Sequence, residues 1–551
     1  MRVEGRFRAL AGGFLAAAIA LSVGQFGSSL SSRLLSPVVA VGELVVDLTP
    51  GSVVRTTIGT FGTMQKPLLL AGIVVVSLLL GALLSWRAPS RLPVALAAFG
   101  AVGGWAMARS PLTSAATSWS LAVIMVGTGL VVVRRAPVSR SDDAVEGDTF
   151  EDPRIKYADR RGFLLYSGGL SATAVALVGA GRVISDRSAQ EARSRFELPT
   201  TTTSPPETTS RPTSSTPPST SPPAIPPTSE PPTTTTPPTT TAPPPSLPDI
   251  DGLDSWITPN ADFYRIDTAL TVPIVDPVGW SMRIDGLVEQ PISLTLDDLL
   301  VLDILDATIT IACVSNTVGG SLVGNATWTG VLLADVLDLA QPQEGAEQVM
   351  AWSVDGFSAG FPLETATDGR TALVAFGMNG EPLPLDHGFP VRLIVPGLYG
   401  YVSAVKWLSH LELTNFDRDG YWIDKGWSKD APVKIASRID VPATRRVEAG
   451  TVPVAGVAWY PDIGVAAVEV SIDSGPWQPC QLGEAGASQD GKPAKTGESW
   501  VQWLYLWEAT PGRHRIRVRA AGSDGTLQPG LPVAPAPNGA EGYHEISVTV
   551  A

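Results

Sequence analysis

Five apolar stretches in the first third of the chain constrain its fold more than any other feature. They cover roughly residues 9–25, 67–85, 92–108, 113–133 and 162–183, and each is about as long as a helix that crosses a bilayer core. Residues 35–48 are also apolar, but Pro37, Glu43 and Asp47 interrupt them, so we expect an interfacial or re-entrant segment there. The sequence therefore predicts an all-α membrane bundle at the N-terminus.

Arginines flank these stretches where the positive-inside rule requires them. They are Arg2, Arg6 and Arg8 before the first stretch, Arg87 and Arg91 after the second, and Arg134, Arg135 and Arg140 after the fourth. Five spans that start in the cytoplasm leave everything after residue 185 outside it. We expect a multi-pass protein of the cell membrane, in contact with the lipid bilayer, whose later domains are extracytoplasmic.

The fifth stretch begins with the run Asp159-Arg160-Arg161-Gly162-Phe163-Leu164, which resembles a twin-arginine export signal. That pathway exports folded proteins, so it suits a domain that receives a cofactor in the cytoplasm. The alternative interpretation is an ordinary anchor with positive charges on its cytoplasmic side. We find no convincing cleavage site and expect the segment to remain as a span.

Residues 200–247 are almost entirely Thr, Pro and Ser. Such a composition cannot bury a core and favours extended polyproline II structure. At ~3.1 Å per residue the tract could reach on the order of 100 Å. We interpret it as a stalk through a cell wall, and a plain disordered linker is the alternative.

Composition excludes several classes of protein. The formal net charge of −14 argues against nucleic acid as a partner. The only cysteines are Cys313 and Cys480, so a disulfide framework is excluded, and we expect Cys480 to be a free buried thiol. All four histidines lie at or beyond His387, so the membrane part cannot hold a bis-histidine haem.

Five short segments between residues 257 and 408 carry the chemistry of the chain. They contain the patterns T-P-N-x-x-F-Y-R from Thr258, a β-branched strand that ends at Cys313, W-x-G-V from Trp328, H-G-x-P-x-R from His387 and Y-G-x-x-S-x-x-K-W from Tyr399. In this order the set resembles the sulfite oxidase and related molybdopterin oxidoreductase family, over about residues 255–550. The resemblance implies a molybdenum–molybdopterin cofactor.

A molybdenum ion held by a pterin dithiolene needs one further soft ligand, and the resemblance assigns that role to Cys313. A buried structural cysteine would be the default interpretation of a single Cys. The cofactor also carries a phosphate, which calls for cationic and polar side chains. By resemblance, the residues that bind the cofactor are Asn260, Phe263, Tyr264, Asn316, His387, Arg392, Ser403 and Lys406.

The resemblance also implies two further catalytic residues. Arg265 matches, within one residue, an arginine that faces the metal and an oxyanion substrate, although a surface arginine is an equal alternative. Tyr421 is a candidate for the catalytic tyrosine of sulfite oxidases, in a segment whose register is ambiguous. If Tyr421 is displaced from the metal, sulfite becomes a doubtful substrate.

The C-terminal 116 residues, 436–551, contain short β-rich runs separated by Pro and Gly, which predict a seven-strand sandwich. They resemble the immunoglobulin-like dimerisation domain of sulfite oxidases, which implies a homodimer. Periplasmic methionine-sulfoxide reductases of the wider family lack this domain, so its presence favours the oxidase.

The predicted fold is multidomain: an all-α membrane bundle, an α+β sulfite-oxidase-type molybdopterin domain and an all-β immunoglobulin-like sandwich. The expected parts are four spans in 1–136, a cytoplasmic loop and twin-arginine-like fifth span in 137–185, the stalk in 186–249, the molybdopterin domain in 250–435 and the sandwich in 436–551.

We expect a membrane-anchored oxidoreductase that transfers an oxygen atom and two electrons to or from a small oxyanion such as sulfite. The sequence has no C-x-x-C-H haem-attachment motif, so we expect no haem in this chain. The electron partner is then an external cytochrome or a quinone-linked membrane protein. The alternatives are a reductase of S-oxides or N-oxides, such as methionine sulfoxide, and a non-catalytic stalked binding protein of the envelope.

Overall fold

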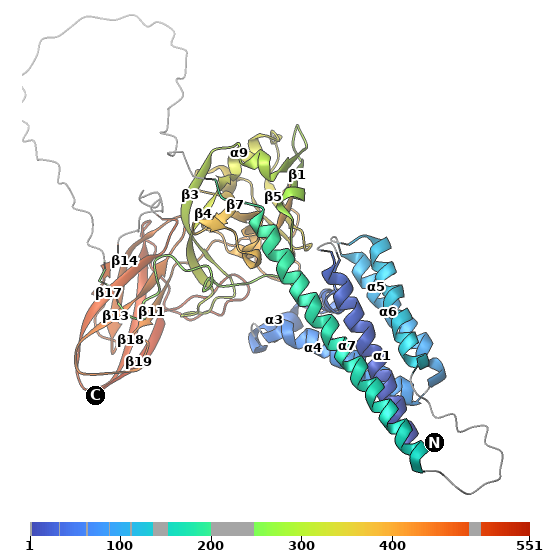
Figure 1. Ribbon diagram of the computed structural model, residues 1–551. Coiled ribbons are helices and arrows are strands. Elements are labelled where there is room, and N and C mark those ends of the chain that lie inside the picture. The colour runs from blue at the N-terminus through green and yellow to red at the C-terminus, as the bar shows by residue number, and fades with distance from the viewer. Residues whose placement is uncertain are drawn as a thin grey trace, which may run out of the picture.

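The computed structural model describes residues 3–31, 34–61, 64–87, 89–110, 113–135, 153–199, 247–248, 250–483 and 497–551. Figure 1 shows three parts: a bundle of long helices, a central β-rich part and a C-terminal β-rich part at the far side of it. We call them the helical unit (up to residue 199), the central unit (250–435) and the C-terminal unit (436–551).

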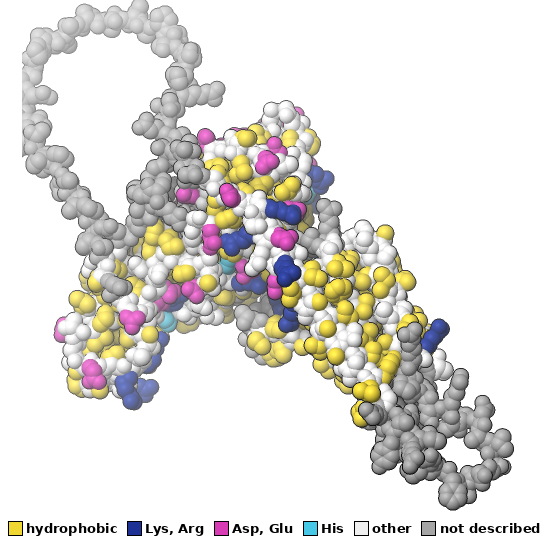
Figure 2. All heavy atoms as spheres, viewed as in Figure 1, with side chains coloured by type: hydrophobic (Ala, Val, Ile, Leu, Met, Phe, Trp, Pro, Cys, Tyr) yellow, Lys and Arg dark blue, Asp and Glu magenta, His cyan; other side chains and the backbone are white. Residues whose placement is uncertain are grey.

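Helix α1 (Val3–Ser29) is the centre of the helical unit and packs against α4 (Gln65–Arg87), α6 (Ala115–Arg135) and α7 (Pro153–Ser194), while α5 (Leu92–Arg109) packs on α6. In the described residues, five helices are long and apolar enough to cross a membrane, at the five places that the sequence predicts. Figure 2 shows hydrophobic side chains spread over the visible surface of these helices. An apolar outer surface suits a lipid environment.

The segment predicted to be interfacial or re-entrant contains a short helix, α2 (Pro37–Leu48), which is followed by α3 (Gly51–Phe61). Ser36 caps α2 because its Oγ accepts the N–H of Val39, and Pro37 occupies the first helical turn. Its 12 residues are too few to cross a bilayer. Helix α2 packs against α4 and α5 instead.

Helix α7 extends well beyond the predicted end of the fifth stretch, to Ser194. The prediction that disordered stalk begins at residue 186 is therefore wrong for residues 186–194. The reason is that the chain after the helix docks on the central unit: the buried Phe196 ring meets Phe376 and Phe389 at centroid distances of 6.1 and 6.4 Å. Residues 200–246, which make up most of the predicted stalk, lie outside the described residues.

The central unit contains two five-stranded sheets with a shared hydrophobic core. The first has the order β2 (Ile292–Thr295), β1 (Ser281–Gly286), β10 (Leu408–Thr414), β5 (Gln348–Ser353), β6 (Ser358–Pro362). The second has the order β3 (Ile304–Ala312), β4 (Val323–Leu332), β7 (Leu373–Met378), β8 (Glu381–Pro382), with β9 (Arg392–Ile394) also on β7. The short helices are α8 (Leu296–Leu299), α9 (Leu333–Asp338), α10 (Glu364–Thr367) and α11 (Gly400–Ser403), with 3-10 turns η3 (Pro277–Gly279) and η4 (Leu385–His387).

Local sequence explains several of these elements. Buried and exposed residues alternate along β1 as period-2 patterning predicts. A capping box of Thr295 and Asp298 begins α8, because each side chain bonds the backbone of the other. Strand β3 ends at Ala312, so Cys313 is the first residue after it, as the sequence predicts.

The C-terminal unit also has two sheets, which share a core of their own. One has the order β11 (Ala436–Val441), β13 (Gly450–Trp459), β17 (Val501–Ala509), β16 (Gln481–Leu482), and the other β12 (Arg446–Val447), β19 (His544–Val550), β18 (Gly512–Gly522), β14 (Val465–Ile472), β15 (Gln478–Pro479). The described residues thus form more than the seven strands expected, because β12, β15 and β16 have two residues each and leave no alternation in the sequence. Cys480 is free but only half-buried, since it lies between two of these short strands.

Gly330, the glycine of the W-x-G-V segment, lies where β4 and β7 pack closely. A Cβ on Gly330 would lie 2.4 Å from the Val374 carbonyl oxygen and 2.7 Å from the Ala375 Cα, at a register shift between β4 and β7. We predict that Gly330→Ala lowers the free energy of unfolding by about 2 kcal/mol, because backbone must move to admit the methyl group. Gly279→Ala is the matched control, since nothing lies within 4 Å of its Cβ position. Denaturation of the purified variants in detergent measures both, and equal unfolding midpoints would contradict the prediction.

Candidate functional site

Cys313 is buried at the end of β3, where its side chain faces two tyrosines. Its backbone N–H donates to the Leu322 carbonyl at 2.9 Å, and its Sγ donates to Ser315 Oγ at 3.5 Å. Burial raises the pKa of the thiol, and the nearby Ser315 opposes that shift. Burial followed by the Cys313 charge raises the pKa of Tyr264, and the same two causes help raise the pKa of Tyr399 to about 12. Both tyrosines therefore stay neutral near the sulfur.

Asn316 shapes the loop that follows Cys313. Its Oδ1 accepts the N–H of Leu322 at 3.0 Å, and a Cβ on Gly320 would lie 2.4 Å from that oxygen. Asn316 therefore closes the turn that returns the chain to β4. This fixes the direction in which Cys313 leaves the sheet.

The predicted opening loop packs directly on the predicted phosphate-binding residues. The Phe263 ring stacks on Tyr264 at 5.3 Å and meets His387 and Trp328 edge-on at 5.6 and 5.7 Å. Asn260 Nδ2 donates to Glu381 Oε1 at 2.6 Å, and the Asn260 carbonyl lies 3.2 Å from His387 Nε2. Asn260, Phe263, Tyr264 and His387 thus form one cluster, as the resemblance implies.

His387 and Arg392 are buried basic residues with spare hydrogen-bonding capacity. They are 3% and 2% exposed. Arg392 Nη1 donates to the His387 carbonyl at 2.9 Å, and its guanidinium lies 4.9 Å from the Trp328 ring centroid. Among the described residues, His387 Nδ1 and Arg392 Nε have no hydrogen-bond partner. Buried polar atoms are rarely left unpaired, so a ligand with acceptor atoms fits between them.

Burial depresses the pKa of both residues, and neighbouring cations add to the shift of His387 alone. Burial first, and then the Lys406 and Arg392 charges, lower the pKa of His387 to about 4, although Asp386 opposes them. Burial lowers the pKa of Arg392 to about 10. An anion bound here would reverse these shifts, because it stabilises the protonated forms.

Lys406 joins this region to a buried carboxylate, Asp267, whose side chain is 4% exposed. Lys406 Nζ donates to the Asp386 carbonyl at 2.8 Å and lies 3.3 Å from Asp267 Oδ2, and burial lowers its pKa to about 8. Asp267 also pairs with Arg265 at 2.9 Å and with Lys66 of the helical unit at 2.6 Å. Burial alone would raise the pKa of Asp267, but its three cationic neighbours hold it well below the usual range.

Ser403 is buried in α11, and its Oγ donates to the Tyr399 carbonyl at 3.2 Å. It therefore fixes the turn that presents Tyr399. Tyr401, in the same helix, donates to the Ser428 carbonyl. These bonds hold the segment between β9 and Lys406 against the central core.

The two remaining predicted residues make other contacts. The Arg265 side chain is 40% exposed and pairs with Asp267. It therefore joins Lys66 and Lys406 around that carboxylate. Tyr421 donates its N–H to the Ser358 carbonyl at 3.0 Å, and its ring packs on Phe357. Burial, and then the charges of Asp47 and Asp355, raise the pKa of Tyr421 to about 12. In the described contacts, neither residue touches Cys313.

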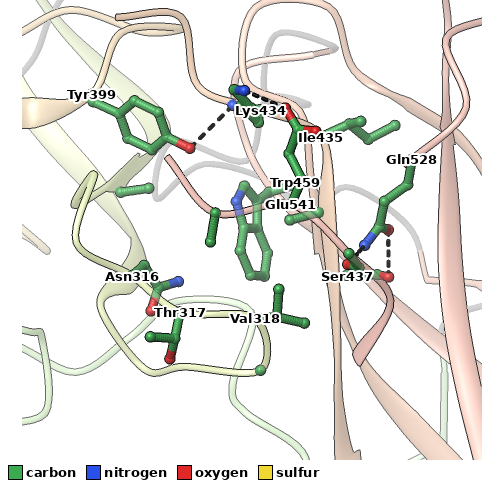
Figure 3. A pocket seen from close by; sticks show the side chains of 15 residues that line it. Asn316, Thr317, Val318, Tyr399, Lys434, Ile435, Ser437, Trp459, Gln528 and Glu541 are labelled. Carbon is green, nitrogen blue, oxygen red and sulfur yellow. Dashed lines mark hydrogen bonds and ion pairs between the residues drawn. The ribbon is translucent and has the colours of Figure 1, made fainter. Parts of the chain in front are cut away.

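A pocket between the central and C-terminal units reaches the same strand end (Figure 3). Ala312, Asn316, Tyr399 and Lys434 line it from the central unit, and Ser437, Gln528 and Glu541 from the C-terminal unit. Lys434 pairs with Glu541, the Lys434 N–H donates to the Tyr399 hydroxyl, and Ser437 donates to Gln528. Sequence patterns did not identify the residues beyond 433, because single polar residues in a β-rich region look like solvent-facing positions.

The buried His387 generates a pH dependence of stability. Because its pKa falls from 6.5 to about 4 on folding, the unfolded chain binds a proton between these values and the folded chain does not. We predict that stability is full above pH 6.5 and falls toward pH 4, by up to ~3 kcal/mol from this group. His387→Gln should remove that part of the loss, leaving the contribution of His544, whose pKa is also lowered to about 4.

Chemical denaturation at pH 7 and pH 4.5 measures the effect. His514→Gln is the control, because the hydrogen bond that this histidine donates to Asp473 raises its pKa, so it cannot cause a loss of this sign. An unchanged pH dependence in His387→Gln would contradict the prediction.

The chain is similar in sequence to known molybdopterin-binding oxidoreductases. Residues 269–422 match the family described as the oxidoreductase molybdopterin binding domain. Sulfite oxidase of Arabidopsis thaliana is 30% identical over 310 residues, which are 47% of this chain and 78% of that protein. Mitochondrial sulfite oxidase of Homo sapiens is 30% identical over 299 residues, 46% of this chain and 53% of that protein. The chain thus spans about half the length of its mammalian relatives.

Among solved structures, the sulfane dehydrogenase SoxCD from Paracoccus pantotrophus is 22% identical, with a TM-score of 0.47. That similarity covers 54% of this chain and 82% of the SoxCD chain.

Proposed function

Because the chain belongs to the sulfite oxidase family of molybdopterin-binding oxidoreductases, we propose that its central unit is an enzyme that binds a molybdenum–molybdopterin cofactor. The observation that carries the proposal is Cys313, a buried free thiol that acts electrostatically on Tyr264, the same tyrosine on which the buried Arg392 acts. A soft thiolate suits molybdenum, and buried cations suit the phosphate of the pterin. Bound molybdenum would supply two-electron oxygen-atom transfer.

The residues present fit this cofactor. His387 Nδ1 and Arg392 Nε, which lack partners among the described residues, would donate to the anionic end of the pterin, and Lys406 would add a third cation. Phe263 and Tyr264 would enclose the ring system, since they pack over His387. Asn260, Asn316 and Ser403 would act through the backbone turns that they hold.

The thiol of Cys313 must lose its proton to bind a metal. Burial favours the protonated thiol, so the charge of the metal would have to offset that cost. The Ser315 hydroxyl is hydrogen-bonded to this thiol, with its Oγ 3.5 Å from the sulfur. Its role would be to accept from the thiol in the free protein and to donate to the thiolate once the proton has left.

We propose sulfite, or a similar small oxyanion, as the substrate, on the basis of the relatives. The pocket beside Asn316 and Tyr399 would admit it from the junction with the C-terminal unit. A specific observation favours the reverse reaction, reduction of an S-oxide or N-oxide: Arg265 and Tyr421, the residues expected to face the oxyanion, contact Asp267 and Phe357. A turnover experiment must therefore include both directions.

The placement of the enzyme in the cell is also a proposal. The five apolar helices would cross the cell membrane, with the arginines that precede the first apolar stretch and follow the fourth in the cytoplasm. The central and C-terminal units would then be extracytoplasmic, exported after folding if Arg160 and Arg161 act as a twin-arginine signal. The C-terminal unit, with two sheets over one core, would be the immunoglobulin-like domain and would support a homodimer. Electrons would pass to a cytochrome or to a quinone-linked membrane protein.

Substitution of Cys313 tests the proposed function. We predict that the purified wild-type protein contains molybdenum and pterin and reduces a dye when sulfite is added. In Cys313→Ser, sulfite-dependent reduction should fall to background, because a serine oxygen is a poor substitute for a soft thiolate ligand. Elemental analysis, pterin fluorescence and dye reduction give the three measurements, and Cys480→Ser is the matched control.

Each result has a distinct meaning. Metal together with sulfite oxidation that Cys313→Ser abolishes would establish the oxidase. Metal without sulfite oxidation, but with reduction of methionine sulfoxide or another S-oxide, would establish the reductase. Suppose that folded protein, purified from a host that produces the cofactor, contains neither metal nor pterin. That result would overturn the proposal of an enzyme and would favour a binding protein of the envelope.

A further inference from the structure

The residues on the two sides of the Thr/Pro tract pack on the same folded body, which consists of the central and C-terminal units. Before the tract, Phe196 lies in the core of the central unit. After it, Leu247, Ile250 and Leu253 pack on Val441, Ala455 and Leu504 of the C-terminal unit. Those two units are joined directly, because Trp500 N–H donates to Thr310 Oγ1 at 2.7 Å and Thr310 N–H to the Glu498 carbonyl at 2.9 Å. A tract with both ends on the same body does not set the distance between that body and the helices.

The end of α7 makes the first attachment between the helical and central units. Arg193 Nη2 donates to Glu381 Oε2 and to the Pro382 carbonyl, both at 2.8 Å, and Arg195 pairs with Asp276 at 2.9 Å. The Phe196 ring between Phe376 and Phe389 adds buried apolar area to these polar bonds. A buried aromatic side chain contributes more to such an attachment than an exposed ion pair does.

Lys66, in the first turn of α4, makes the second attachment. Its ammonium group donates to Asp267 Oδ1 at 2.6 Å and to the carbonyls of Asp267 and Ala269 at 2.7 Å each. All three donors of the group are therefore used within one loop of the central unit. Nearby, Gly42 of α2 faces the Leu270 side chain, and Gly51 of α3 faces the Lys425 carbonyl.

Both attachments lead to residues expected to bind the cofactor. Arg193 holds Glu381, whose other oxygen accepts from Asn260. Lys66 holds Asp267, whose other oxygen lies against Lys406 and Arg265. In each case a cation of the helical unit shares a carboxylate with a side chain of the candidate site.

We propose that the helical unit is a docked and permanent part of the cofactor site, with Lys66 and Arg193 as positioning residues, so that contacts between the units, and not the length of the Thr/Pro tract, set the distance between them. The positioning role rests on the proposed function, whereas the docking does not. Lys66 neutralises Asp267 on one oxygen, so less of the carboxylate charge is left to draw Lys406 away from an anionic cofactor. The central unit would consequently stay in contact with the helical unit during turnover.

Cleavage of the tract tests the docking. A specific protease site is placed within residues 210–240 of the full chain, which carries an N-terminal affinity tag, and the protein is cut to completion in detergent. We expect the fragment with the central and C-terminal units to stay on the affinity column with the helical fragment. A variant with Lys66→Met, Arg193→Ala and Phe196→Ala should release it after the cut.

The first of two failures overturns the docking, and the second overturns the assignment of Lys66, Arg193 and Phe196 as the attachments. Release of the wild-type fragment would mean that the tract alone joins the halves, as in a stalk. Retention of the triple variant would mean that other contacts hold them. Gel filtration of the uncut triple variant shows whether it has remained folded, and a variant with Phe196→Ala alone, which should release part of the fragment, supports the test if it has not.

Cofactor content tests the positioning role. We expect Lys66→Met to retain about tenfold less molybdenum and pterin per chain than the wild type, as for other residues that orient a metal site through a neighbour. Lys66→Arg should restore the content, because it keeps the charge and its donors. Lys429→Met is the matched control, because the contacts that it removes, with Asp419, the Arg418 carbonyl and the Phe416 ring, involve no residue of the candidate site.

Wild-type cofactor content in Lys66→Met would overturn the positioning role. Absence of metal from the wild-type protein would instead overturn the proposed function, and the cleavage experiment would still report on the docking. The two failures are therefore distinguishable.

Discussion

The Asp267 carboxylate is the interaction on which the assembly of this molecule depends. One side chain, 4% exposed, meets Lys66, Arg265 and Lys406, which come from the helical unit, the opening loop and the end of the central unit. A buried carboxylate is costly unless it is paired, and three buried or half-buried cations repel one another without it. Each group is therefore stable in place only when the others are present. This mutual requirement fixes the helical unit and the candidate site relative to each other.

Much of the fold follows from local sequence. Apolar stretches of bilayer length form helices, and buried and more exposed residues alternate along strands such as β1 and β18. Cys313 could be placed at a strand end because a β-branched run stops there. The grouping of Asn260, Phe263, His387, Arg392 and Lys406 could be predicted from a resemblance, since those residues lie in short patterns with fixed spacing. Periodicity and short motifs are encoded within a few turns or one strand, so a single sequence reveals them.

The contacts between units were not predictable in this way. Lys66 and Asp267 are 201 positions apart, and no periodic pattern connects two such residues. Phe196 follows the polar end of α7. In the sequence, a single aromatic residue at such a position cannot be distinguished from part of a linker. Arg265 was expected at the metal, yet Asp267, two positions later, offers a local carboxylate that takes its guanidinium. Tyr421 lies in a Trp- and Gly-rich loop, where side-chain direction depends on packing against Phe357 rather than on spacing.

The working unit is consequently larger than the segment that the family shares. Residues 269–422 include Cys313, His387, Arg392, Ser403 and Lys406. The groups that hold them come from outside that segment: Asn260 and Phe263 from the opening loop, Lys66 and Arg193 from the helices. Lys434, at the end of the central unit, and Glu541, of the C-terminal unit, close the pocket beside Tyr399. A buried cation is unfavourable unless it is paired, and Asp267, which pairs with Lys406, is itself held by Lys66 of the helical unit. The cofactor site should therefore assemble only when all three units are docked.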